Sequence, residues 1–191
     1  MPNWCSTEIT ITCKDMSEAK KLYELVEDWT SSDKMENGFG HNWLGNVVLG
    51  SGIGTVDEDV NTDIRCRGYI TDKYYSGNKV RISTETAWAP MLRMWVLIMA
   101  KYTPGAQINY EAVESGMEIY STNWQEMAGT YYVDIWDHDT SYCETEENAK
   151  RIMQLILKSD EENFEKLAYE LEEEELGVCH PWEIVPVTEW D

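Results

Sequence analysis

The sequence predicts an α+β protein built on a ferredoxin-like βαββαβ sandwich, in which an antiparallel sheet carries two helices on one face. Three observations predict this class: the order of strand-like and helix-like segments, an amphipathic helix after the first strand, and a sharp strand-to-helix junction at residues 83–90. Sequential strands tend to be neighbours and crossovers are right-handed, so few other arrangements accommodate this order.

The first strand and helix have clear patterns. Ile9, Ile11 and Cys13 alternate with threonines, which predicts a strand over residues 6–13. Asp15 followed by Glu18 is typical of a capping box and predicts a helix of about 14 residues. The apolar stripe of that helix consists of Met16, Ala19, Leu22, Leu25, Val26 and Trp29.

A long insertion is expected after the first helix. From residue 30 to 63 the apolar periodicity disappears, and six glycines fall between Gly38 and Gly54. We expect an irregular segment with one short strand or helical turn, of a length that is often functional.

The next segments complete the sandwich. Residues 64–70 and 80–84 alternate like half-buried strands, and the Gly77-Asn78 pair between them predicts a hairpin. Pro90 is expected in the first turn of a helix that ends before residues 102–105, because proline has no amide to leave unpaired there. A further strand begins at Ile108.

The remaining residues predict extra strands and a C-terminal helical region. Residues 117–122 and 130–136 are expected to be strands that could extend the sheet, and 145–158 and 161–176 to be helices. Gly177 is in the position of a helix C-cap, and residues 182–190 suggest a last edge strand. We therefore predict a domain over residues 1–143 and an acidic helical extension, 144–191, packed on it.

Charge is the strongest bulk property. The formal net charge is −21, which argues against nucleic acid and anionic membranes as ligands. Residues 144–191 hold 15 acidic and 4 basic side chains, a net charge of −11. The run Glu172, Glu173, Glu174 and Glu175 is either a solvated helix end or a patch that binds a basic partner protein. With no apolar run of about 18 residues and no signal sequence, we expect a cytoplasmic protein.

Candidate metal ligands form incomplete sets. Asp57, Asp59, Asn61 and Asp63 have the spacing of a calcium loop, but Thr62 and Gly68 replace its required Gly and Glu. The group at the end of the second extra strand, which could bind zinc or manganese or form a polar turn, is Asp134, Asp137, His138 and Asp139. We predict no metal and no cofactor.

No catalytic residue is predicted either. The five cysteines lack CxxC spacing, and no serine or cysteine lies in a nucleophile motif. The candidate ligand-binding residues are Asn42, Trp43 and Trp88, because both tryptophans lie outside the apolar stripes. They either pack in the core or line a groove beside the 83–90 junction.

Four segments, in order, carry a resemblance to a known family. They are Met1–Ser6, Asn42–Asn46, Ile64–Gly68 and Thr84–Pro90, and the Thr-Ala-Trp-x-Pro sequence in the last is the most specific. Together they resemble the YubB ferredoxin-like domain family of bacterial plasmids, phages and other mobile elements, over residues 1 to about 122. The resemblance implies a small ferredoxin-like protein without an established activity. Residues 117–120 depart from the family's Phe-x-Gly ending, and the region after 143 has no counterpart.

Two functions from different classes remain open. The first is a non-enzymatic binding protein of mobile-element origin that acts through its acidic and aromatic surface. An acidic mimic of nucleic acid that blocks a host protein is a special case of this function. The alternative is a small-molecule binding protein or enzyme that uses a pocket near Trp43 and Trp88. The sequence makes no prediction about oligomeric state.

Overall fold

The computed structural model describes residues 3–31, 40–55, 63–136 and 141–190. The chain divides into two compact units: the first is Met1–Ile119 with Val185–Asp191, and the second is Tyr120–Ile184. The second unit is therefore inserted near the end of the first. This division differs from the predicted boundary at residue 143, which lies inside a strand of the second unit.

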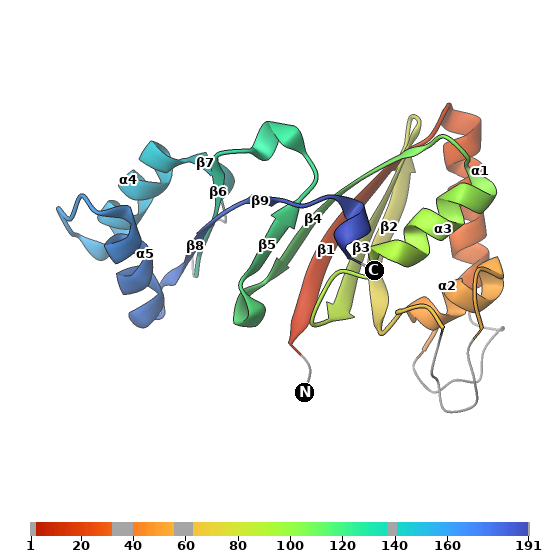
Figure 1. The fold of residues 1–191 in the computed structure, drawn as a ribbon, viewed down its shortest axis with the longest axis horizontal. Coiled ribbons are helices and arrows are strands. Elements are labelled where there is room, and N and C mark those ends of the chain that lie inside the picture. Colours follow the sequence, from red (N-terminus) through yellow and green to blue (C-terminus); the bar gives the residue numbers. More distant parts are fainter. Residues whose placement is uncertain (1–2, 32–39, 56–62, 137–140, 191) are drawn as a thin grey trace. The chain divides into compact units, whose positions relative to one another are not determined.

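Four neighbouring strands of a six-stranded sheet belong to the first unit; they are antiparallel and have the order β2-β3-β1-β4 (Figure 1). This arrangement confirms the predicted mixed α+β class. The elements are β1 (Trp4–Thr12), α1 (Met16–Trp29), α2 (Leu44–Ser51), β2 (Gly68–Ser76), β3 (Lys79–Ala87), α3 (Leu92–Tyr102) and β4 (Gln107–Glu114).

The three helices of this unit lie on the same side of the sheet (Figure 1). Strand β1 shows why: Cys5, Ile9 and Ile11 are buried, while Ser6 and Glu8 between them are exposed. Successive side chains of a strand point to opposite faces, so one face of the sheet forms the core with the helices. The largest fully buried side chains of this core are Trp95, Tyr110, Ile9, Ile11, Leu22, Leu44, Ile70, Ile82, Leu92, Met94 and Ile98.

The start of α1 confirms the predicted capping box. The Glu18 amide donates to Asp15 Oδ1 at 3.0 Å, and Glu18 Oε2 accepts from the Lys14 amide at 2.8 Å. The first bond satisfies an amide that the helix start would otherwise leave unpaired, and the second ties the Glu18 side chain to the residue before the N-cap, Asp15.

The insertion contains more regular structure than the sequence predicted. Residues 44–51 form the eight-residue helix α2, and Leu44, Val47 and Val48 are fully buried. Its apolar residues surround most of the helix, so they show no amphipathic period from which a helix could be recognised. Residues 32–39 and 56–62 of the insertion lie outside the described residues.

The strand-to-helix junction is present, with one correction. Helix α3 begins at Leu92 with Met91 as its N-cap, so Pro90 precedes the helix and is not in its first turn. The hairpin turn between β2 and β3 is formed at Gly77, whose φ of 58° favours glycine.

The second unit has its own sheet and core. Its three-stranded antiparallel sheet has the order β7-β6-β8, and a short parallel pair joins β5 to β9. Its core cluster is Val133, Ile135, Ala149, Met153, Leu167, Leu171 and Cys179. The elements are β5 (Ile119–Thr122), β6 (Thr130–Ile135), β7 (Ser141–Thr145), α4 (Glu146–Leu157), α5 (Phe164–Glu173), β8 (Gly177–Pro181) and β9 (Glu183–Ile184).

Three expectations about this region need correction. Strand β6 pairs with β7 and β8, so the second predicted strand belongs to a separate sheet. Gly177 is not a helix C-cap: it begins β8, where a Cβ would lie 2.3 Å from the Asp134 carbonyl oxygen. The predicted tail strand is reduced to the two residues of β9, followed by a 3₁₀ turn at Val187–Glu189. None of the described helices is long and apolar enough to cross a lipid bilayer.

Candidate functional site

Trp88 lies exposed at the end of β3 in an unusual backbone conformation. Its φ is 65°, a region that residues with a Cβ rarely adopt, and 46% of its surface is exposed. Its amide donates to the Asn3 carbonyl at 2.9 Å, and the Arg67 guanidinium lies 4.8 Å from its ring centroid. The chain thus holds a large aromatic side chain in solvent, beside a cation, in a conformation that costs free energy.

Two further aromatic residues lie near this position. Trp4 and Tyr69 are 43% and 41% exposed, and their rings meet edge to face at 5.5 Å. Arg67, also exposed, lies two residues before Tyr69, and its carbonyl accepts from the amide of Ala87, the neighbour of Trp88, at 2.9 Å. We call Trp4, Arg67, Tyr69 and Trp88 the aromatic corner. Trp4 and Tyr69 were not predicted as site residues, although the pairing of β1 with β3 places Trp4 opposite Ala87.

Trp43 has a different role from Trp88. It is 6% exposed, forms the N-cap of α2, and its ring lies where a Cβ on Gly45 would be. Asn42 fastens the same segment to β2: its carbonyl accepts from the Ile70 amide at 2.8 Å, and its Oδ1 lies 3.4 Å from Lys73 Nζ. Both residues therefore attach α2 to the sheet, which is the packing alternative considered for them.

The acidic run Glu172–Glu175 forms the end of α5, and all four side chains are exposed. The Leu176 amide bonds to the Leu171 carbonyl at 3.0 Å, and Glu175 has a φ of 53°. This is a Schellman ending, in which glycine normally takes the left-handed position. The backbone bearing the four carboxylates is therefore fixed, with a glutamate where glycine would cost less free energy.

The electrostatic environment of this run is unfavourable. The last turn of α5 has no basic residue, and the C-terminal end of a helix carries a partial negative charge. In the described residues, the recorded ion pairs of the second unit join Lys150 to Glu162 and Lys166 to Glu161, away from the run. The second unit has 17 acidic and 4 basic residues, a net charge of −13.

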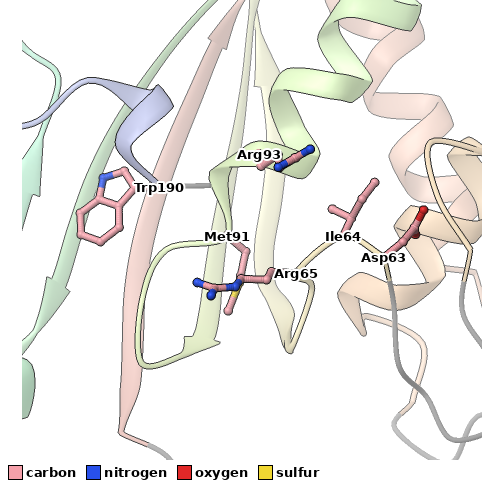
Figure 2. Close-up of a pocket in the computed structure, with 6 residues that line it drawn as sticks. All are labelled: Asp63, Ile64, Arg65, Met91, Arg93 and Trp190. Carbon is pink, nitrogen blue, oxygen red and sulfur yellow. The ribbon is translucent and has the colours of Figure 1, made fainter.

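A cavity of about 160 Å³ opens beside the start of α3 (Figure 2). Neither Trp43 nor Trp88 lines this cavity. The residues that line it are Asp63, Ile64, Arg65, Met91, Arg93 and Trp190. Sequence reasoning missed this site because residues about 125 positions apart form it, and none of them belongs to a local motif.

The titratable groups do not form a nucleophilic or metal centre within the described residues. Burial raises the pKa of the Cys5 and Cys13 thiols to about 11 and that of Cys179 to about 12, so these thiols are protonated at neutral pH. No group of three metal-competent side chains occurs in the described ranges.

The predicted metal ligands are only partly described. Asp134 Oδ2 accepts from Tyr132 Oη at 3.3 Å, and Asp63 Oδ1 accepts from the Thr55 amide at 2.8 Å. The remaining candidates lie outside the described residues; they are Asp57, Asp59, Asn61, Asp137, His138 and Asp139.

No protein-family model, curated protein or solved structure matches the chain.

Proposed function

We propose that this protein is a non-enzymatic binding protein whose acidic run, Glu172–Glu175, recognises a basic partner protein. The observation that carries the proposal is the placement of four exposed carboxylates at the negative end of α5, without a basic residue in its last turn. Like charges gathered at this end destabilise the free protein, and a cationic partner would remove that cost on binding.

The rest of the unit supports this interpretation. Helices α4 and α5 begin with Thr145 and Asn163 as caps, and Glu146, Glu147 and Glu165 lie in their first turns, where negative charge is favourable. The unit therefore follows the usual charge rules at both helix starts and breaks them at the end of α5. Local exceptions to a consistent pattern are typical of functional sites.

The same proposal includes a fold and an origin. We infer that the first unit is a ferredoxin-like domain, supported by its β2-β3-β1-β4 antiparallel order and by helices on one face. The resemblance to the YubB family suggests a cytoplasmic protein of a bacterial plasmid or phage. The aromatic corner, with its strained Trp88, would provide a second contact surface for partners.

A pull-down with matched variants tests the function. One variant changes Glu172, Glu173, Glu174 and Glu175 to Gln. The control variant removes the same number of charges at four other exposed positions of the second unit: Glu126, Glu146, Glu147 and Glu165. We expect the wild type and the control to retain the same basic proteins and the first variant to lose them, with the fold of each checked by circular dichroism.

The captured protein is then purified and its affinity measured at increasing salt. The affinity of the wild type should fall as ionic strength rises past about 0.15 M, where the screening length is about 8 Å. Equal capture by all three proteins would contradict the proposal. If the partner binds DNA and DNA displaces it competitively, the acidic run acts as a mimic of nucleic acid.

A further inference from the structure

We propose that the cavity beside the start of α3 binds a small organic anion, with one phosphate or carboxylate group on an aromatic or apolar body. The cavity lies in the first unit and involves no residue of the acidic run, so this site is independent of the proposed partner binding. Its volume of about 160 Å³ corresponds to roughly five water molecules, which suits a ligand of one small ring and one anionic group.

Two cations flank this cavity. Figure 2 shows Arg65 extending from the segment before β2 toward the Trp190 side, and Arg93 extending from the start of α3 toward Ile64. Within the described part of the chain, neither guanidinium makes a hydrogen bond or an ion pair. Both side chains are exposed, so each guanidinium is open to an anionic ligand that enters from solvent.

One carboxylate, that of Asp63, also belongs to the lining. Asp63 Oδ1 accepts a hydrogen bond from the Thr55 amide, which holds this side chain toward the preceding loop. Three of the five arginines in the chain, Arg65, Arg67 and Arg93, belong to this end of the first unit. Among the described residues that line the cavity, two arginines and one aspartate leave a formal charge of +1, although the protein as a whole is strongly negative.

The start of α3 adds to this potential. The helix has 11 residues and its N-cap, Met91, provides no side-chain hydrogen bond to the first turn. The amides of a first turn without a cap remain available to an acceptor, and the helix dipole is positive at this end. An anionic oxygen at the rim would reach both the amides and Arg93.

The remaining lining explains the apolar body of the ligand. Ile64 and Met91 are 5% and 9% exposed and form an apolar wall. Trp190 Nε1 donates to Tyr110 Oη at 2.6 Å, and Tyr110 Oη donates to the Val185 carbonyl at 2.9 Å. With its N–H already used, the indole offers its ring surface to a ligand, in an orientation fixed by these two bonds.

Four probes separate the contributions to binding: phenyl phosphate, benzoate, inorganic phosphate and phenol, each measured by titration calorimetry with the full chain. We expect phenyl phosphate or benzoate to bind more tightly than inorganic phosphate, and phenol to show no binding. The tighter of the first two identifies the anionic group. The indole N–H resonances of ¹⁵N-labelled protein locate the site: the signal that is absent in Trp190→Phe should be the one that shifts with ligand.

Matched arginine variants test the residues. Arg65→Gln and Arg93→Gln should each weaken binding of the aromatic anion about tenfold or more, the usual effect of losing a hydrogen bond to a charged group. Arg81→Gln is the control, because Arg81 is exposed on β3 and lies outside the cavity. The proposal is wrong if no probe binds at 10 mM, if phenol binds as tightly as the anions, or if Arg81→Gln weakens binding equally.

Discussion

Trp88 shows how one residue can reveal a conflict between stability and use. A left-handed backbone conformation costs about 1–2 kcal/mol for a residue with a Cβ, and glycine avoids this cost. The exposed Trp88 side chain recovers only part of it through Arg67, since an exposed cation–π contact contributes about 0.5–1 kcal/mol. Backbone strain that exceeds the stabilisation from local contacts is characteristic of binding sites.

Comparing Trp88→Ala with Trp88→Gly isolates this strain. Both variants lose the ring, but only glycine relieves the backbone. The relief is reduced by the greater entropy of glycine in the unfolded chain, so Trp88→Gly should be more stable by about 0.5–1 kcal/mol. Urea unfolding gives both free energies. Equal stabilities would show that the left-handed conformation at Trp88 is not a strain in the folded protein.

At the scale of elements, success of the sequence analysis depended on local signals. Helix α1 was predicted correctly because its apolar stripe and Asp15 cap lie within a few residues of each other. Helix α2 has no polar face, and β7 and β8 have five residues each, so none shows a readable period. Gly177 has two possible uses, helix cap or tight strand contact, and only the neighbouring Asp134 carbonyl decides between them.

The candidate sites follow the same rule. The exposure of Glu172–Glu175 could be anticipated, because charge is a local property, whereas the sequence left core packing open for Trp88, which the structure shows to be exposed. Burial of Trp43 depends on its packing over Gly45. The cavity depends on Trp190, Arg65 and Arg93, which are distant in sequence, lining the same space. Such contacts join distant segments, which a single sequence does not specify.

The effect of helix position on charge can be tested by making the same double Glu→Gln substitution at the end of α5 and at the start of α4. The two double variants should change the free energy of unfolding in opposite directions. Glu172→Gln with Glu173→Gln removes charges from the negative end of α5 and should raise the free energy of unfolding. Glu146→Gln with Glu147→Gln removes charges from the positive end of α4 and should lower it. Each change should be about 0.3–1 kcal/mol per charge at low salt.

Urea unfolding at 20 mM and 500 mM NaCl measures both pairs, and the higher salt should shrink both effects. Changes of the same sign would show that overall charge reduction, and not position in the helix, determines the result. A gain in stability for the α5 pair, together with loss of partner capture, would show that the acidic run is kept at the expense of stability.

At the scale of the whole molecule, the two units differ in charge and in continuity. The second unit carries a net charge of −13, leaving −8 for the first from its 19 acidic and 11 basic residues. The chain leaves the first unit near Ile119 and returns at Val185, where Trp190 packs against the first core. Completion of the first unit therefore requires the last residues of the chain, and a truncation at 184 would remove Trp190 from both the core and the cavity.

The large negative charge determines how stability depends on pH. Burial raises the pKa of Glu85, and burial with the nearby Glu8 carboxylate raises that of Glu111. The folded state therefore binds protons more readily than the unfolded state at these positions, so stability rises as pH falls from neutral through their folded pKa values. Hydrogen bonds from the Asn163 amide and Lys166 lower the pKa of Glu161, so its contribution is lost only in stronger acid.

The buried thiols determine how the stability changes at alkaline pH. The pKa of Cys179 is about 12 in the folded protein against 9.0 for the free thiol, so stability falls as pH rises above 9. We expect the melting temperature to be higher at pH 5.5 than at pH 7.5, and lowest at pH 9.5. For a chain of this size about 1 kcal/mol corresponds to a shift of roughly 2–4 °C.

The effect of salt on the melting temperature distinguishes general repulsion among the carboxylates from the pKa shifts of single buried groups. Adding 0.5 M NaCl screens repulsion among the carboxylates, so it should raise the melting temperature at pH 7.5 and have little effect near pH 4.3, where the net charge approaches zero. Thermal unfolding followed by circular dichroism at the two pH values measures this difference. Carboxylate repulsion does not limit the stability of this fold if the melting temperature is lower at pH 5.5 than at pH 7.5. The same conclusion holds if salt does not change the melting temperature at pH 7.5.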